Sequence, residues 1–341
     1  MAARQVARSG PPRIGILGFG RMAEGWHLPA FGRAGCEVVA ALDVTEARRE
    51  RARALGIPVV CDNLKSFLEA DIDAALIATH SAVRSEAALP LAKAGVHLLI
   101  EKPLSTTGAE AKKIVAQCKK SRVVLSVYHN RRWDPDYQIV KAMVQSGFIG
   151  QLVSIENRMF HQEPATSFGA REFKQEWRIT QRMGGGTLLD WGPHLIDQAL
   201  DLAGHSGKPV AVKSVWADVR HVRYGDADDH FQIDMLFSNG VRALVSKSDV
   251  TPKGPNYKWL VTGTNGSLVY AEDKLLAKAN NGQERSVDRG PATPSLHRNF
   301  RDAIEGKDKA WVTPEQALRV VLVMDAARKS AKEGKSVAGK I

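Results

Sequence analysis

Apolar and polar positions follow different patterns in the two parts of this chain. In the first 130 residues, short and continuously apolar runs alternate with helical segments of roughly ten to fifteen residues. The apolar runs predict strands at 13–17, 36–43, 57–62, 72–80, 96–103 and 122–130, and the segments between them predict helices at 22–35 (broken), 46–56, 63–70, 84–95 and 106–121. Strands that alternate with helices form βαβ units, so this part predicts an α/β Rossmann domain with a doubly wound parallel sheet.

From residue 151 onward, apolar positions alternate with polar ones. Strands of this kind are expected at 151–160, 211–222, 229–250 and 258–273, and the pairs Asn239-Gly240 and Asn265-Gly266 predict tight turns. Among the strands we expect one helix, at about 193–203, and after them an amphipathic helix at about 314–333 that packs back on the body. The pattern predicts an α+β domain with a large, mostly antiparallel open sheet.

The two patterns also set the expected domain organisation. We predict a disordered lead-in at 1–12, a Rossmann domain at 13–130 and an α+β domain for substrate binding and oligomerisation at 131–341. Because the predicted helices are too few to cover both faces of the second sheet, a homodimer or homotetramer formed through the bare face is expected.

Composition excludes several classes of protein. The 341 residues are 44% hydrophobic and 25% charged, which is typical of a soluble globular protein. No apolar run is long enough for a membrane span, and the basic N-terminus lacks the apolar core of a secretory signal. Three scattered cysteines predict neither disulfides nor a metal site, so a cytoplasmic location is expected. The net charge of +11 raises the question of nucleic acid, but no basic motif interleaved with aromatic residues follows, so none is expected.

The segment GFGRMA at 18–23 has the features of a dinucleotide-binding turn. It follows a strand, opens a helix, and places Gly18, Gly20 and Ala23 where a tight turn, a close pyrophosphate and close helix packing each need a small residue. Asp43 ends the next strand, where an acid binds the adenosine ribose. A carboxylate there repels a 2′-phosphate, so NAD is favoured over NADP, although Arg48 and Arg49 could soften this preference.

Two further segments are candidates for reaction chemistry. IEKPLS at 100–105 ends an apolar strand with Glu101, Lys102 and Pro103. On these residues alone, it is a strand exit with an ordinary surface lysine. In the segment 184–200, Pro193 suits a first helical turn, and Asp190, His194, Asp197 and Asp201 recur at helical spacing. That spacing by itself fits a solvated helix face with a capping aspartate and a surface histidine better than a catalytic pair.

Taken together, these motifs resemble the glucose–fructose oxidoreductase/inositol dehydrogenase (Gfo/Idh/MocA) family, and the scyllo-inositol dehydrogenase-like branch most of all. The resemblance covers nearly the whole chain and rests on the segments at 18–23, 27–31, 94–105, 130–137, 184–202 and 313–337. It implies an NAD(P)-dependent oxidoreductase that moves a hydride between nicotinamide and a secondary alcohol of a sugar, inositol or related polyol. The motif in which Lys102 lies often has a cis lysine–proline bond in relatives, so a cis bond is predicted before Pro103.

The resemblance also implies roles for individual residues. Lys102 matches the family lysine, and Asp190 and His194 match its aspartate and histidine. Histidine titrates nearest neutral pH, so His194 would be the general base, Lys102 would stabilise the alkoxide, and Asp190 would contact a substrate hydroxyl or orient His194. Cofactor contacts are expected from Gly18, Phe19, Gly20, Arg21, Met22, Asp43, Thr79, Glu101, Lys102 and Asn130. For the substrate wall, the candidates are Arg131, Trp177 and Arg178, for which packing or surface roles are equally open.

Alternatives and departures remain at this point. A reductase or an NAD-dependent glycoside-modifying enzyme could use the same scaffold, and a dinucleotide-sensing regulator could lack chemistry altogether. The regulator would be expected to lose the lysine or the histidine, whereas this chain keeps both. Relatives often carry a proline and a histidine where this sequence has His80 and Arg84. No role follows for those two residues, and the sequence names neither the sugar, the carbon nor the physiological direction.

Overall fold

The computed structural model describes residues 10–167, 176–205, 207, 210–252, 257–287 and 294–341. The chain forms two compact units. Their boundaries do not follow a single division of the chain at residue 130. Unit 1 comprises Met1–Tyr128, Gly169–Lys174 and Ser295–Leu318, and unit 2 comprises His129–Phe168, Gln175–Pro294 and Arg319–Ile341. A C-terminal segment that the sequence assigned to the second domain therefore packs with the first. Most of the predicted lead-in lies outside the described residues.

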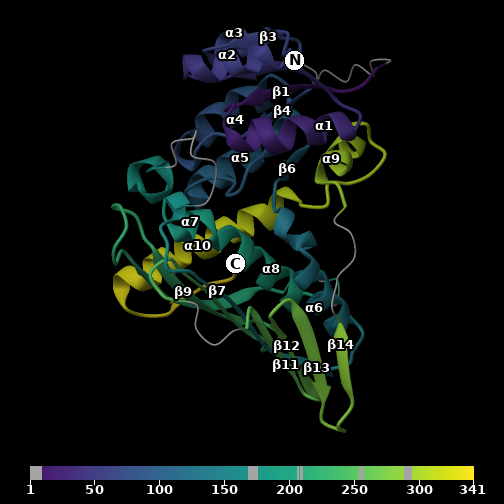
Figure 1. The fold of residues 1–341 in the computed structure, drawn as a ribbon, viewed down its shortest axis with the longest axis vertical. Helices are drawn as coiled ribbons and strands as arrows, with labels where there is room; N and C mark the ends of the chain where they lie inside the picture. Colours follow the sequence, from purple (N-terminus) through teal and green to yellow (C-terminus); the bar gives the residue numbers. More distant parts are fainter. Residues whose placement is uncertain (1–9, 168–175, 206, 208–209, 253–256, 288–293) are drawn as a thin grey trace. The chain divides into compact units, whose positions relative to one another are not determined.

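Unit 1 is built on a six-stranded parallel sheet in the order β3-β2-β1-β4-β5-β6 (Figure 1). Its strands are β1 (Arg13–Leu17), β2 (Glu37–Leu42), β3 (Val59–Cys61), β4 (Ala74–Ile77), β5 (His97–Ile100) and β6 (Leu125–Val127). Nearly all residues of β1, β4, β5 and β6 are buried, as expected for a sheet covered on both faces. The parallel sheet and the strand order confirm the predicted Rossmann fold.

Most helices of unit 1 lie within the ranges predicted from the sequence. They are η1 (Ala23–His27, a π-helix), α1 (Leu28–Arg33), α2 (Glu46–Ala54), α3 (Leu64–Leu68), η2 (Ser81–Val83), α4 (Arg84–Lys93), α5 (Gly108–Ser121) and α9 (Leu296–Ile304). The side chains of Asn63, Thr107 and Ser295 cap α3, α5 and α9 by accepting a backbone N–H. The first helix is irregular rather than broken as predicted, because the π-helical turn Ala23–His27 continues directly into α1.

Unit 2 is built on a nine-stranded sheet in the order β14-β13-β12-β11-β7-β10-β9-β8-β15 (Figure 1). Its strands are β7 (Leu152–Phe160), β8 (Val212–Arg220), β9 (His230–Phe237), β10 (Arg242–Ser248), β11 (Trp259–Gly263), β12 (Gly266–Ala271), β13 (Lys274–Ala279), β14 (Glu284–Val287) and β15 (Val337–Ala338). Only β7 and β10 pair in parallel among these strands, so the sheet is mostly antiparallel as predicted.

One face of the second sheet carries the helices of unit 2. Helix α8 (Gly192–Ala203) packs on β7 and β10, α7 (Thr187–Asp190) on β9 and β10, and α6 (Pro135–Gln145) on β12 and β13. Short 3₁₀ turns complete the unit: η3 (Asn130–Trp133), η4 (Ala165–Ser167), η5 (Glu176–Ile179) and η6 (Gln181–Met183). The last helix, α10 (Pro314–Glu333), matches the predicted bounds and starts in unit 1.

The sequence-based prediction did not include α6, α7, α9, β13, β14, β15 or the short 3₁₀ turns. Helix α6 starts with Asp134 at the N-cap and Pro135 at the first helical position, a start signal that could have revealed it. Helix α9 is nine residues long and its start is marked by Ser295. No helix among the described residues is long and apolar enough to cross a membrane. The three cysteines are free and buried.

Candidate active site

The glycine turn of unit 1 has room for a dinucleotide. Gly18 has φ +88°, and a side chain there would meet the backbone of Ala78 and Thr79 at 2.9 Å, so only glycine fits. A Cβ built on Gly20 would meet no atom within 4 Å. The backbone at Gly20 is thus open to a pyrophosphate, and the helical residues Arg21 and Met22 follow directly, partly exposed. These residues fit the predicted cofactor.

Asp43 ties the end of β2 to this turn. One of its carboxylate oxygens accepts the N–H of Phe19 at 2.8 Å, and the other accepts the N–H of Thr45 at 2.8 Å. The ring of Phe19 is fully buried, so the predicted cofactor contact of this residue can come only from its backbone. Each carboxylate oxygen can accept a second hydrogen bond, which leaves Asp43 able to bind a ribose hydroxyl.

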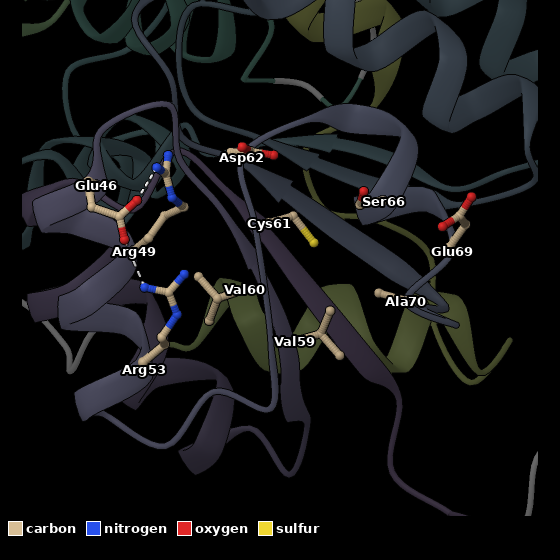
Figure 2. Close-up of a pocket in the computed structure, with 10 residues that line it drawn as sticks. All are labelled: Glu46, Arg49, Arg53, Val59, Val60, Cys61, Asp62, Ser66, Glu69 and Ala70. Carbon is tan, nitrogen blue, oxygen red and sulfur yellow. Dashed lines mark hydrogen bonds and ion pairs between the residues drawn. The ribbon is translucent and has the colours of Figure 1, made fainter.

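Two arginines of α2, Arg49 and Arg53, are already engaged. Arg49 donates to the backbone carbonyl of Asp43 at 2.8 Å and pairs with Glu46, and Arg53 pairs with the same glutamate at 2.9 Å. Figure 2 shows both contacts in a pocket whose wall also includes Asp62 and Glu69. Three carboxylates therefore face two arginines, and this pocket is not built for an anion.

The strand exit of β5 places Glu101, Lys102 and Pro103 at the carboxyl end of the sheet, where ligands bind in open α/β folds. The Lys102–Pro103 bond is cis, which confirms that prediction. Glu101 is buried, and Lys102 is half-buried. Thr79 follows the neighbouring strand β4, and within the described part of the chain its buried hydroxyl has no hydrogen-bond partner. That hydroxyl also fits a polar ligand at this edge.

In unit 2, the segment that carries Asp190 and His194 is buried rather than solvated. Asp190 ends α7, and His194 lies in the first turn of α8, with exposed fractions of 6% and 7%. The spacing-based interpretation of a solvated helix face is therefore wrong. His194 also packs edge-on against Trp191, with 5.7 Å between ring centroids.

Arg178 pairs with the Asp190 carboxylate, and its guanidinium stacks over the ring of Trp177 at 4.6 Å. Two of the three predicted substrate-wall residues thus lie beside the predicted catalytic aspartate. The glycine run at 184–186 allows this approach, since a Cβ on Gly185 would lie 2.3 Å from the Trp177 carbonyl oxygen.

The segment 130–134 is hydrogen-bonded to α8. Arg132 makes two hydrogen bonds of 2.6 Å to Asp197, and both side chains are almost fully buried. Gln198 donates to the Arg131 carbonyl at 2.6 Å, and the Arg131 guanidinium stacks over Trp191 at 5.0 Å. These contacts place Arg131 beside Trp191, and hence near His194, while Asn130 opens the same turn.

A buried ion pair near Asp190 was missed from the sequence. Lys247 near the end of β10 is 0% exposed and pairs with Asp249. Burial lowers the pKa of Lys247, and the carboxylates of Asp249 and Asp190 oppose that shift. Burial likewise raises the pKa of Asp249. A lysine and an aspartate two residues apart at a strand end are common on surfaces, so only the fold reveals their burial.

The predicted catalytic residues thus come from both units: Lys102 belongs to unit 1, and Asp190 and His194 belong to unit 2. Among the described residues, no group of three or more histidine, cysteine, aspartate or glutamate side chains is arranged to hold a metal ion.

Both the fold and these strand-end residues are those of a nicotinamide-nucleotide-binding oxidoreductase. Residues 12–129 match the model of an oxidoreductase family with an NAD-binding Rossmann fold, and residues 137–269 match the GFO/IDH/MocA C-terminal domain. The protein belongs to the Gfo/Idh/MocA oxidoreductase family. This finding confirms the resemblance drawn from the motifs.

Similar proteins extend over almost the whole chain. It is 24% identical to scyllo-inositol 2-dehydrogenase (NADP(+)) IolW of Bacillus subtilis, over 95% of each chain. It is 26% identical to myo-inositol 2-dehydrogenase of Thermotoga maritima, over 95% of this chain and 98% of that protein. A crystal structure of an NAD-binding protein from Listeria innocua has a TM-score of 0.83 and 26% identity, covering 96% of this chain and 97% of that one.

Proposed function

We propose that this protein is an NAD-dependent dehydrogenase that acts on a secondary alcohol of an inositol, sugar or related polyol. The observation that carries the proposal is the buried Asp190–Arg178 pair with His194 one helical turn further along. A nucleotide sensor without chemistry would not need an acid and a base buried at such a cost. Two relatives that match nearly the full length are named for inositols, which makes inositols the first substrates to test.

Oxidation of the alcohol breaks one C–H and one O–H bond. Bound NAD would supply the hydride acceptor, and the protein's residues handle the proton and the charge. In this proposal, His194 takes the hydroxyl proton, the Lys102 ammonium donates a hydrogen bond to the same oxygen as it becomes an alkoxide, and Asp190 accepts a hydrogen bond from a neighbouring hydroxyl. In the reverse direction, His194 returns the proton.

The cofactor preference rests on Asp43 and its surroundings. A 2′-phosphate at the end of β2 would meet the Asp43 carboxylate, while the nearby Arg49 is held by Glu46 and the Asp43 carbonyl. These contacts support NAD over NADP. The IolW relative is named for NADP(+), so the preference differs from that protein's.

The test is a screen of inositols, sugars and acyclic polyols with both oxidised cofactors, followed by absorbance of the reduced nicotinamide. With the substrate found, Lys102→Met and His194→Ala are expected to lower kcat by at least about a thousandfold, as loss of a proton-transfer or alkoxide-binding group does. NADH binding, followed by fluorescence, should survive in both variants.

Matched controls are Lys274→Met and His221→Ala, which change exposed residues of the same types. Both are expected to retain wild-type kcat. Full activity in either Lys102→Met or His194→Ala would contradict the assigned roles, and failure of every alcohol to reduce either cofactor would contradict the dehydrogenase proposal.

A further inference from the structure

Arg84 is a buried arginine that the proposed chemistry does not use. It opens α4, and only 4% of its surface is exposed. Burying a cation costs free energy unless its N–H groups find hydrogen-bond acceptors. The acceptors of the Arg84 guanidinium therefore show what this side chain holds in place.

The guanidinium of Arg84 connects the ends of two neighbouring strands. Its Nε and Nη2 donate to the carbonyl of Thr79, which follows β4, at 3.1 and 2.8 Å. Its Nη1 donates to the carbonyls of Glu101 and Pro103, which follow β5, at 2.7 and 2.6 Å. The two β5-side carbonyls belong to the residues immediately before and after Lys102, so Arg84 holds the main chain on both sides of that lysine.

The side chain of Glu101 also makes contacts that hold this turn. One carboxylate oxygen accepts the N–H of Lys102 at 3.1 Å, and the other lies 2.9 Å from Nε2 of His27. Burial on its own would raise the pKa of Glu101, but the hydrogen bond from His27 and the charges of Lys102 and Arg84 bring it to about 2. The group is an anion at neutral pH.

The carboxylate of Glu101 contacts the first of two buried histidines. A carboxylate only accepts, so Nε2 of His27 is the donor in this contact. His297 of α9 lies with Nε2 2.9 Å from Nδ1 of His27, and both histidines are almost fully buried. Glu101, His27 and His297 thus form a hydrogen-bonded chain from the Lys102 turn to α9, entirely within unit 1.

We propose that Arg84 and Glu101 are positioning residues for Lys102: Arg84 clamps the carbonyls on both sides of the lysine to the end of β4, and Glu101, backed by His27 and His297, fixes the lysine's own N–H. The proposal rests on the function proposed above, because a fixed backbone matters only if the Lys102 ammonium must meet one oxygen. A misplaced catalytic group can cost about a hundredfold in rate even when it is still present.

The test compares Arg84→Met and Arg84→Lys with Arg319→Met. Arg319 is a matched control because it is half-buried and also donates to main-chain carbonyls, those of Val210 and Ile341 in unit 2. The first measurement needs no substrate: backbone hydrogen exchange of the peptide 98–105, followed by mass spectrometry. Arg84→Met is expected to speed exchange there by about tenfold or more, since it removes four charge-assisted hydrogen bonds, whereas the exchange of β1 and β2 stays unchanged.

The second measurement is turnover. Arg84→Met is expected to lower kcat by about tenfold to a hundredfold with KM within about threefold of wild type, because the effect falls on the transition state. Arg84→Lys keeps a buried cation but cannot reach the carbonyls of both strand ends at once, so its exchange and kcat should lie between those of Arg84→Met and wild type. If Arg84→Met does not fold, Arg84→Lys carries the same test.

The outcomes separate the positioning role from the proposed chemistry. Unchanged exchange at 98–105 in both Arg84 variants overturns the clamp, whatever the activity. Faster exchange with unchanged kcat overturns the claim that the clamp serves Lys102. A wild-type kcat in Lys102→Met instead defeats the role assigned to Lys102 in the proposed function and leaves the exchange result standing.

Discussion

Asp43 has a structural contact in addition to its expected ligand. By accepting the N–H of Phe19, its carboxylate joins the end of β2 to the glycine turn, so the residue that would select the cofactor also shapes the phosphate site. Selectivity and turn geometry are therefore coupled in one side chain, and a substitution that keeps a hydrogen-bond acceptor is needed to separate them.

Asp43→Asn keeps an acceptor oxygen and removes the negative charge. We expect the ratio of the NADPH to the NADH dissociation constant to fall by about tenfold, because repulsion of the 2′-phosphate is lost. Fluorescence titrations with both reduced cofactors measure the ratio, and Asp273→Asn, which changes an exposed acid between β12 and β13 in unit 2, is the control. Much tighter binding of NADPH than NADH by the wild-type protein would refute the NAD preference.

His297 gives the protein a specific sensitivity to acid. Burial, together with the neighbouring His27, lowers its pKa from 6.5 to about 3. Between those values the unfolded chain binds a proton that the folded chain does not, so the free energy of unfolding falls as the pH decreases from about 6.5 toward 3.

His297→Gln removes this titration while retaining a donor that can reach His27. Between pH 6 and 4, the free energy of unfolding of the wild type should fall more steeply than that of the variant, by up to about 1.4 kcal/mol per pH unit, the value for one proton. Urea denaturation at several pH values measures both slopes. The exposed His221, changed to Gln, should leave the wild-type slope unaltered, and parallel slopes for wild type and His297→Gln would show that His297 is not the acid-sensitive group.

At the scale of elements, α8 is held by charge as well as by apolar packing. Its face toward η3 and α6 carries Asp197, bound by Arg132, and Asp201, bound by Tyr137 and Lys141. These contacts fix the helix whose first turn carries His194. A helix held by directed hydrogen bonds keeps its rotation about its own axis, which sets where that imidazole points.

Breaking the Arg132–Asp197 pair should be costly because the remaining charge stays buried. Arg132→Met is expected to lower the free energy of unfolding by about 3–5 kcal/mol, and adding Asp197→Leu should recover a large part of the loss. Urea denaturation followed by circular dichroism measures both. A more exposed pair offers the comparison: Arg220→Met, which loses the contact with Asp218, should cost no more than about 1 kcal/mol. Equal losses for the two single variants would contradict the buried-pair argument.

At the scale of the molecule, the second sheet exposes one face. The cross-strand neighbours on this open face include the apolar Trp216, Leu236, Leu244, Leu260 and Leu276, of which Trp216, Leu236 and Leu276 are 41%, 38% and 48% exposed. We propose that a second copy of the chain covers this open face, as the predicted oligomer requires.

The variant Trp216→Glu with Leu236→Glu places two charges on the open face. Light scattering coupled to size-exclusion chromatography should give a dimer or tetramer for the wild type and a monomer for the double variant, because buried unpaired charges oppose association. Val222→Glu, at an exposed valine outside the strands, is the control and should keep the wild-type mass. A monomeric wild type would end the proposal.

Local chemistry made a large part of this protein predictable. The continuous apolar runs identified the parallel sheet, since a strand buried on both faces cannot tolerate polar positions. Gly18 and Gly20 identified the dinucleotide turn, because the backbone at Gly18 fits only glycine and a small residue at Gly20 leaves room for a pyrophosphate. The prediction missed α9, although its apolar residues Leu296, Phe300, Ala303 and Ile304 recur at helical spacing after the N-cap Ser295.

The sequence by itself determined the strands of the parallel sheet, the glycine turn, the acid at the end of β2 and the family, because each depends on residues close together in the chain. Only the tertiary structure decided which charges meet. Arg132 and Asp197 are 65 residues apart, His27 and Glu101 are 74 apart, and His27 and His297 are 270 apart. The hydrophobic periodicity of the sequence does not predict such pairings. They depend on how strands and helices from distant segments pack and on the removal of water from the contact.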